Sequence, residues 1–479
     1  MVYEAVIGLE VHAQLHTKTK IFCACPAQFG GEPNSRTCPV CLGLPGALPV
    51  LNRRVVEFAS RAALALGGNV SRESIFARKS YFYPDLPKGY QITQYDRPLA
   101  TGGALGIESG AGTKTIRIER IHMEEDAGRL VHDPATGHGL VDFNRAGVPL
   151  IEIVTKPDIS SPDEAVAFLR SLRQILTYLG VCDGNMEEGS LRCDANVSVR
   201  RAGSTGLGPR TELKNLNSFR FIERAITLEI ARQTAACESG AEITPATFMY
   251  DQKADAVRLM RKKKGSEDYR YFQEPDLQPL RLDNDWVSGI LESQPELPAA
   301  RRRRFEEEYA LPAYDAGVLT ADRDLADFFE DTVKLHRSPK TVSNWIMTEL
   351  LHELGRERLE IPMSPVTPNT LAGLLSLVEK GELSGKMARE VFAGMFRTGS
   401  TALQIATEQG LRQISDRETL RTVVDSVVKA HPAEFERLRG GETKMIDFFT
   451  GAAMRATHGK ANPVVLSQII KALMDTPTT

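Results

Sequence analysis

The segment Ile7-Gly8-Leu9-Glu10-Val11-His12-Ala13-Gln14 alternates apolar and polar side chains, which is typical of a half-buried β-strand. Successive side chains of a strand point to opposite faces of its sheet. We therefore expect the apolar side chains of this segment to lie in a hydrophobic core. Glu10, His12 and Gln14 then share the opposite face.

Other expected strands also present carboxylates on a polar face. In residues 191–199 this face contains Asp194, and residues 210–215 place Glu212 and Lys214 on one face. Periodicity alone does not show that these strands meet in space. Several separate strands that each present a carboxylate nevertheless suggest an active site.

Glu124, Glu125 and Asp126 follow one another at the end of a further expected strand. This run could equally cap a helix, because negative charge is favourable at a helix N-terminus. Glu152 lies inside the apolar segment 148–154, where a carboxylate is costly unless it is paired or bound to a metal. Carboxylates together with one imidazole suit a hard cation such as Mg²⁺.

The spacing of apolar residues along the chain changes near residue 290. Before it, short alternating runs and turns predict an α+β domain, and beyond it apolar residues recur every three or four positions, which predicts helices. The clearest predicted helices span residues 324–336, 341–354, 370–379 and 464–474. We expect an α+β fold with three parts: a cradle-like mixed α/β catalytic domain at 1–292, an all-α domain at 293–404 and a small all-α tail domain at 405–479.

Four cysteines cluster soon after the first strand: Cys23, Cys25, Cys38 and Cys41. A Cys-x-Cys pair and a Cys-x-x-Cys pair can each present two thiolates to one tetrahedral ion, which predicts a structural zinc site in an insertion at 23–41. Four cysteine ligands leave no open position for water, so this metal would not be catalytic. The alternative is a set of free or disulfide-bonded cysteines in an ordinary loop.

The composition is that of an ordinary globular protein. The 479 residues are 42% hydrophobic and 25% charged, with a formal net charge of −3, so a nucleic acid would be met by local basic patches. The first residues lack the features of a signal peptide, and no apolar run is long enough to span a bilayer. We expect a cytoplasmic protein without a membrane partner, where reduced thiols favour zinc over disulfides.

Several long strings resemble the family of aspartyl/glutamyl-tRNA amidotransferase B subunits. The strings are residues 7–12, 78–92 (Arg-Lys-Ser-Tyr-Phe-Tyr-Pro-Asp-Leu-Pro-Lys-Gly-Tyr-Gln-Ile), 123–128, 186–196, 212–219, 343–345 and 459–463. The resemblance runs from end to end. It departs at Gln273, where the family pattern has proline, and at Gly451-Ala452-Ala453 in the tail.

The resemblance implies an ATP-dependent carbon–nitrogen ligase with glutamine as the amide donor. Such a subunit phosphorylates the side-chain carboxylate of Glu on tRNA(Gln), Asp on tRNA(Asn), or both, and then amidates it with ammonia. The chain contains neither a Gly-Gly-Ser-Ser amidase string nor a lone cysteine nucleophile. By resemblance, an amidase A subunit would supply the ammonia, a small C subunit would complete a heterotrimer, and the tail would bind tRNA.

The resemblance also implies roles for individual residues, with ATP and Mg²⁺ as cofactors beside the structural Zn²⁺. Lys79 and Tyr81 would lie on a loop that lines the pocket, and we assign Lys214 to substrate or nucleotide binding as well. Lys79 could equally be a plain surface charge. The expected catalytic residues are Glu10, His12, Glu124, Glu125, Asp194 and Glu212, of which all but Glu124 would hold Mg²⁺.

Two other functions fit part of the sequence. A zinc-stabilised RNA-binding protein without catalysis would account for the cysteines and the helical tail, but it leaves the carboxylates unused. A metal-dependent hydrolase would use Glu10 and His12 and would not require ATP. Dependence on ATP and charged tRNA separates these alternatives from a ligase.

Overall fold

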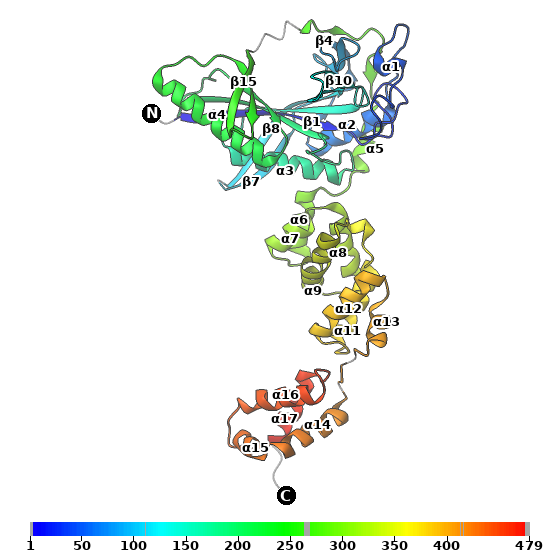
Figure 1. The fold of residues 1–479 in the computed structure, drawn as a ribbon, viewed down its shortest axis with the longest axis vertical. Coiled ribbons are helices and arrows are strands. Elements are labelled where there is room, and N and C mark those ends of the chain that lie inside the picture. Colours follow the sequence, from blue (N-terminus) through cyan, green and yellow to red (C-terminus); the bar gives the residue numbers. More distant parts are fainter. Residues whose placement is uncertain (1–2, 111, 263–268, 412, 415, 475–479) are drawn as a thin grey trace. The chain divides into compact units, whose positions relative to one another are not determined.

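A computed structural model describes residues 3–110, 112–262, 269–411, 413–414 and 416–474 (Figure 1). Residue contacts divide the chain into two compact units, unit 1 from Met1 to Pro298 and unit 2 from Ala299 to Thr479. Unit 1 combines strands and helices, whereas unit 2 is helical in its described part. The predicted α+β fold with a helical C-terminal region is therefore confirmed.

A ten-stranded mixed sheet forms the centre of unit 1. Its paired neighbours are antiparallel except β13 and β14, which run parallel. In spatial order the strands are β15 (Ala256–Lys262), β14 (Ala246–Asp251), β13 (Thr211–Leu216), β12 (Leu191–Arg201), β1 (Tyr3–Gln14), β11 (Pro149–Thr155), β8 (Gly112–Glu125), β6 (Ala100–Thr101) and β2 (Asn69–Val70), with β7 (Ala104–Ser109) paired to β8.

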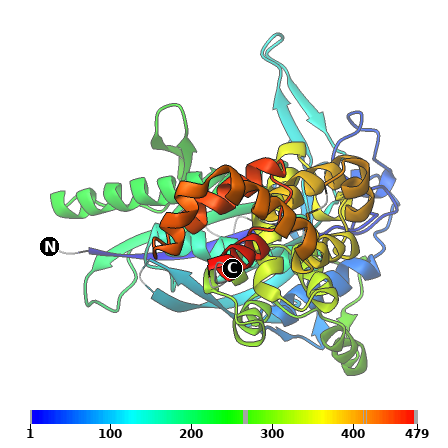
Figure 2. The ribbon, with the colours of Figure 1, turned by 90° about the horizontal axis from the view of Figure 1, so that it is seen from below.

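The described residues of unit 1 also form three smaller sheets. In one of them β4 (Phe76–Ser80) lies between β5 (Tyr90–Gln94) and β16 (Phe272–Gln273). Figure 2 shows β9 (Arg129–His132) and β10 (Gly139–Asp142) as a projecting two-stranded ribbon. The last pairs β3 (Glu73–Ser74) with β17 (Leu280–Arg281).

The hydrophobic core of unit 1 lies between the sheet and its helices. Leu9, Val11 and Ala13 of β1 are fully buried in it, as the alternation of the segment predicts. Helices α3 (Pro162–Tyr178) and α4 (Phe219–Ser239) lie along this face of the sheet (Figure 1). The described part of unit 1 also contains helices α1 (Pro39–Leu42), α2 (Arg53–Ala65) and α5 (Asn284–Glu292).

Local sequence explains where the two long helices begin. Ser161 precedes α3 and its hydroxyl accepts a hydrogen bond from the backbone N–H of Glu164, while Pro162 occupies the first turn. Ser218 caps α4 in the same way, through the N–H of Phe221. Both helices then bury an apolar stripe against the sheet.

Unit 2 contains two hydrophobic clusters, one from Phe305 to Ala406 and one from Leu420 to Ile470. The predicted helices at 324–336, 341–354, 370–379 and 464–474 are confirmed, the second with a π-helical turn inside it. The elements are α6 (Pro298–Glu308), α7 (Ala313–Leu319), α8 (Arg323–Leu335), α9 (Pro339–Trp345), η2 (Ile346–Leu350), α10 (Leu351–Glu357), η3 (Ile361–Met363), α11 (Pro368–Glu379), α12 (Gly385–Thr398), α13 (Ala402–Glu408), α14 (Arg417–Ala430), α15 (Pro432–Arg439), α16 (Met445–Ala456) and α17 (Pro463–Met474).

The predicted division into three domains stays a prediction. Its boundary at residue 405 falls inside α13, whose buried residues Ala402, Ile405 and Ala406 pack in the first cluster of unit 2. Leu297, beyond the predicted boundary at 292, still packs against the core of unit 1. Among the described residues, no helix has both the length and the hydropathy that a membrane span requires.

Replacing Phe168 of α3 by alanine should destabilise unit 1, because this side chain is fully buried in the core. We expect a loss of about 3–5 kcal/mol in the free energy of unfolding. Urea unfolding followed by the fluorescence of Trp286, in a Trp345→Phe background, measures unit 1 alone. Phe29→Ala is the matched control, since Phe29 is 64% exposed; equal losses in both variants would contradict the assigned core.

Candidate functional site

A row of charged side chains crosses the large sheet of unit 1. The antiparallel register places His12 of β1 opposite Glu152 of β11 on one side and opposite Arg192 of β12 on the other. Glu152 is in turn opposite His122 of β8. Directly opposed residues point to the same face of a sheet, so these four side chains lie on the face away from the core.

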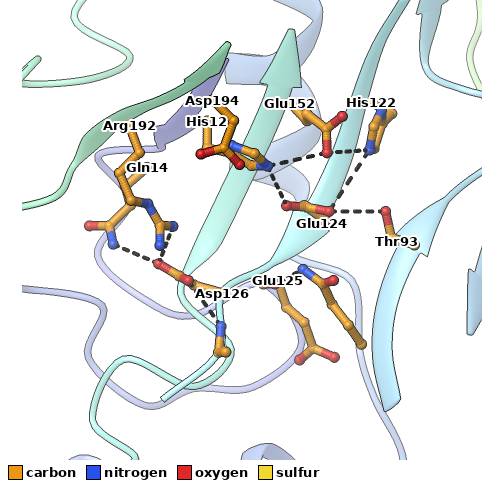
Figure 3. Close-up of polar contacts among 12 residues, drawn as sticks. His12, Gln14, Thr93, His122, Glu124, Glu125, Asp126, Glu152, Arg192 and Asp194 are labelled. Carbon is orange, nitrogen blue, oxygen red and sulfur yellow. Dashed lines mark hydrogen bonds and ion pairs between the residues drawn. The ribbon is translucent and has the colours of Figure 1, made fainter. Parts of the chain in front are cut away.

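Two histidines and two glutamates of this face form one cluster (Figure 3). The Nε2 atom of His12 lies 3.5 Å from Glu124 Oε1 and 3.2 Å from Glu152 Oε2. His122 Nε2 lies 3.4 Å from Glu152 Oε2, and Thr93 Oγ1 donates a hydrogen bond to Glu124 Oε2 at 3.2 Å. Ligand atoms of His12, Glu124 and Glu152 all lie within 4.8 Å of one another, an arrangement that could hold a metal ion.

The electrostatics of the cluster favour a cation at its centre. Burial disfavours a charged imidazole, but the contacts with Glu152 and Glu124 outweigh it and raise the pKa of His12, and that of His122 to about 9. Burial likewise opposes the carboxylate of Glu152, yet the two histidines hold its pKa well below the usual range. A divalent cation bound here would replace the proton on Nε2 of His12 and balance the same carboxylates.

Asp126 organises a second group at the end of β8. Its Oδ2 atom accepts hydrogen bonds from Gln14 Nε2 at 2.9 Å and from Arg192 Nη2 at 2.7 Å, and Arg145 Nε lies 3.6 Å away. Burial opposes the charge of Asp126, but Arg192 and Arg145 outweigh it and lower the pKa of the carboxyl group. The carboxylate therefore fixes the Arg192 guanidinium beside His12.

A third group continues along the same face, on β1, β12 and β13. Lys214 forms an ion pair with Asp194, and its Nζ lies 3.7 Å from Glu212 Oε1. Asn196 Nδ2 donates a hydrogen bond to Glu10 Oε1 at 2.9 Å. Glu10 and Asp194 are opposed in the register of β1 and β12. The structure thus brings Glu10, Asp194, Glu212 and Lys214 to the face that carries His12.

Glu125 points away from these groups, because adjacent residues of a strand point to opposite faces. It forms an ion pair with Lys88 and borders a cavity of about 240 Å³ whose wall includes Lys20 and Cys41. The structure therefore does not place Glu125 with His12, as the expected Mg²⁺ ligand set requires. Glu152 occupies the corresponding position instead.

A polar cavity of about 370 Å³ connects most of the site. Lys79 and Tyr81 lie in its wall, but Lys79 is part of strand β4 and not of a loop, and Tyr81 directly follows this strand. Burial opposes the charge of Lys79, but Glu124 and Glu152 raise the pKa of its ammonium group, which stays protonated. The charged side chains that line the cavity are His12, Lys79, Asp85, Glu124, Asp126, Arg145, Arg192, Asp194 and Lys214.

Two residues of the cluster were not assigned a role from the sequence. His122 precedes Glu124 by two positions, so both must point to one face, and this spacing was the available signal. Glu152 carried a different signal, a carboxylate inside an apolar strand. Its face was not readable, because the strand around it is apolar on both faces.

The four predicted zinc ligands come together in the insertion before α2. Atoms Sγ of Cys23, Cys25, Cys38 and Cys41 lie within 4.8 Å of one another, as a tetrahedral ion requires. The fully buried Lys20 directs its Nζ at Cys41 Sγ, 3.6 Å away, and donates to two backbone carbonyl groups. A buried ammonium group next to the sulfur atoms partly offsets the charge of four thiolates.

The neighbours of Cys41 favour its thiolate form. Its pKa is lowered to about 4, mainly by the hydrogen bond from Cys23, and further by the backbone of Cys38 and the charge of Lys20. A thiolate is the form of cysteine that binds a metal. The donor set and its surroundings therefore fit zinc.

Comparisons with known proteins agree over almost the whole chain. Residues 5–288 match the sequence model of the GatB/GatE catalytic domain, and residues 327–474 match that of the GatB domain. The chain is similar to proteins named as the B subunit of an aspartyl/glutamyl-tRNA(Asn/Gln) amidotransferase. It is 53% identical over 473 residues to that of Geotalea daltonii and to that of Moorella thermoacetica, and 52% identical over 470 residues to that of Thermodesulfovibrio yellowstonii, each time over 98% of this chain and 99% of the relative.

Replacing Cys38 by alanine should remove one of four thiolate ligands, so we expect the purified chain to lose its zinc and to unfold at a lower temperature. Cys237→Ala is the matched control, because Cys237 lies on α4 outside the cluster. Elemental analysis and thermal unfolding of both variants provide the measurement. Equal zinc content in Cys38→Ala and in the unchanged chain would rule the site out.

Proposed function

Because the chain belongs to the family of aspartyl/glutamyl-tRNA amidotransferase B subunits, we propose that it carries out the kinase and transferase steps of tRNA-dependent amidation. It phosphorylates the side-chain carboxylate of Glu on tRNA(Gln), Asp on tRNA(Asn), or both, with ATP. It then transfers ammonia to the activated carboxyl group. The products are Gln-tRNA(Gln) or Asn-tRNA(Asn), ADP and phosphate.

The chemistry requires activation because a carboxylate cannot expel oxide. Transfer of the terminal phosphoryl group of ATP to a carboxylate oxygen forms an acyl phosphate, and ammonia then attacks the acyl carbon and releases phosphate. In phosphoryl transfer the protein itself forms few or no covalent bonds, so catalysis depends on positioning the reactants and on stabilising their charge. A bound divalent cation would neutralise part of the negative charge of the phosphoryl group.

One observation supports this proposal above the others: His12 and Glu124 line the same cavity as Lys79 and Arg192, and Glu152 completes a possible cation site with these two residues. Carboxylates and an imidazole are suited to hold Mg²⁺. The ammonium and guanidinium groups are suited to hold phosphate and carboxylate oxygens. A site for an anionic nucleophile and an anionic nucleotide needs both kinds of group side by side.

The other polar residues of the face would complete the binding of substrates. We propose that Glu10, Asp194 and Glu212 contribute to cation binding along the face that His12 begins, and that Lys214 contacts the substrate or the nucleotide. The hydrogen bonds of Asp126 orient Arg192 toward the cavity. Glu125 is left out of the cation site because its side chain points to the other face of β8.

We propose that the ammonia comes from another polypeptide. Of the buried cysteines outside the zinc cluster, Cys182 has a pKa raised by burial to about 12, and burial raises the pKa of Cys193 well above its usual range. Neither thiol is thus a ready nucleophile for splitting glutamine. We propose an amidase A subunit as the source of ammonia and a small C subunit as the third member of a cytoplasmic heterotrimer.

Glu152→Gln and Asp194→Asn should each lower amide formation about a hundredfold or more, because each removes a charge that the phosphoryl transfer needs. The measurement is amide formation on Glu-tRNA(Gln) and Asp-tRNA(Asn) by the chain purified with its partner subunits. Reactions with free ammonia in place of glutamine do not need the amidase, so they measure the phosphorylation and amidation steps alone. Glu292→Gln, at an exposed position of α5, is the matched control.

Normal amide formation by Glu152→Gln and Asp194→Asn would refute their roles. Absence of product from the unchanged complex with either ammonia source, while tRNA still binds, would favour a non-catalytic RNA-binding protein. Turnover of small esters or amides without ATP would favour a hydrolase.

Removing the second cluster of unit 2 should weaken tRNA binding, since we propose the tail for this contact. A chain that ends after α13, at Leu411, keeps the buried residues of the first cluster of unit 2 and Leu411, which packs against them. We expect a higher dissociation constant for tRNA and unchanged assembly with the partner subunits in size-exclusion chromatography. An unchanged dissociation constant would contradict a tRNA-binding role of the tail.

A further inference from the structure

Five tyrosine side chains form a connected series, and one of them lies in the wall of the polar cavity. We call the series Tyr83, Tyr81, Tyr269, Tyr271 and Tyr95 the tyrosine row. Successive ring centroids are 6.3, 6.1, 6.0 and 4.1 Å apart, and the last pair is stacked with an interplanar angle of 3°. Tyr81 lines the cavity. The row therefore links the cavity to the protein surface.

Parts of this aromatic surface are exposed to solvent. Tyr83 is 53% exposed, Tyr95 is 45% exposed, and the neighbouring Phe82 is 78% exposed. Grouped aromatic side chains bury large areas when they bind a partner, and leaving several of them in water has no value for the fold. The grouping points to a ligand that covers these rings.

The tyrosine row rests on a firm scaffold. Strand β4 pairs with β16, which brings residues 269–271 next to the segment that begins at Lys79. The Arg78 guanidinium forms two hydrogen bonds with Glu274, at 2.7 and 2.9 Å, and lies 4.1 Å from the ring centroid of Tyr90. Rings held in advance lose little conformational entropy when a ligand stacks on them.

Cations alternate with the aromatic rings. Lys79 Nζ lies 5.1 Å from the ring centroid of Tyr269 and 6.0 Å from that of Tyr81, and Arg270 Cζ lies 5.9 Å from that of Phe82. Aromatic faces with interleaved positive charges fit unpaired nucleotides, whose bases stack on the rings while the phosphates meet the cations. An apolar peptide would not use the charges.

The location of the row identifies which nucleotides these are. In an aminoacyl-tRNA the amino acid is esterified to the ribose of the last nucleotide, within an unpaired 3′ end. If the side-chain carboxylate lies in the cavity beside His12 and Lys79, the last bases must lie at the cavity mouth, where Tyr81 leads to Tyr83. We propose that the tyrosine row binds the unpaired 3′-terminal nucleotides of the tRNA substrate by stacking. This proposal rests on the proposed function and specifies how its substrate is held.

The test compares Tyr83→Leu with Tyr83→Phe, which keeps the ring and serves as the matched control. The probes are tRNA(Gln) and the same RNA without its unpaired 3′-terminal nucleotides. We expect Tyr83→Leu to bind intact tRNA about tenfold more weakly and to bind the shortened RNA as the unchanged chain does. Tyr83→Phe should bind both RNAs as the unchanged chain does. Tyr95→Leu tests the other end of the row, and we expect it to weaken the binding of intact tRNA as well.

Steady-state amidation by the complex provides the second measurement. Tyr83→Leu should raise the KM for Glu-tRNA(Gln) about tenfold, while the KM for ATP and the kcat at saturating tRNA stay unchanged. An increase in the KM for ATP instead would assign the rings to the adenine of the nucleotide and overturn the proposal. Unchanged affinity for intact tRNA in both leucine variants would also overturn it.

The two proposals fail in different ways. If the unchanged complex forms amide and the leucine variants behave as it does, only the role of the tyrosine row is wrong. If the unchanged complex forms no amide, the proposed function is wrong, whatever the variants bind.

Discussion

The pairing of β1 with β11 and β12 is the constraint on which the site depends. The apolar side chains of β1 are fixed in the core, so its polar side chains have no choice of face. The registers with the two neighbours then set which residues meet His12: Glu152 on one side and Arg192 on the other. A shift by one residue in either pair would turn these charges into the core. The site is therefore as firmly held as the hydrophobic packing behind it.

Charge balance is the second requirement of this face. His12, His122, Glu124 and Glu152 are largely shielded from water, and unpaired charges there would be costly. They balance each other, two acids against two bases, on strands that cannot easily move apart. Such a preorganised set can exchange protons for a divalent cation with little rearrangement, and it can meet developing charge without the cost of reorienting solvent. Lys79, Arg192 and Lys214 add positive charge on the same side.

Much of this architecture was readable from local sequence. The two-residue period gave the faces of β1, the three-to-four-residue period gave the helices of unit 2, and the cysteine spacing gave a cluster of four sulfur atoms. Glu125, and not Glu124, was expected to hold Mg²⁺. The structure places Glu125 on the other face of β8, because side chains alternate along a strand and Glu125 shares its face with the core residues Ile121 and Met123. The face of Glu152 depends on the register of β11, which only its partner strands determine. The predicted boundary at 405 stays a prediction; it falls inside α13, whose packing on the first cluster of unit 2 is a tertiary contact that local sequence does not show.

The central claim is that this sheet face activates a carboxylate by transferring phosphate to it. Amidation of Glu-tRNA(Gln) whose side-chain carboxylate carries ¹⁸O tests it directly, with ATP and free ammonia supplied to the complex and the released phosphate analysed by mass spectrometry. An acyl phosphate leaves one carboxylate oxygen on the phosphate, so we predict one ¹⁸O atom in phosphate for each amide formed. Amide formation with unlabelled phosphate would contradict the account.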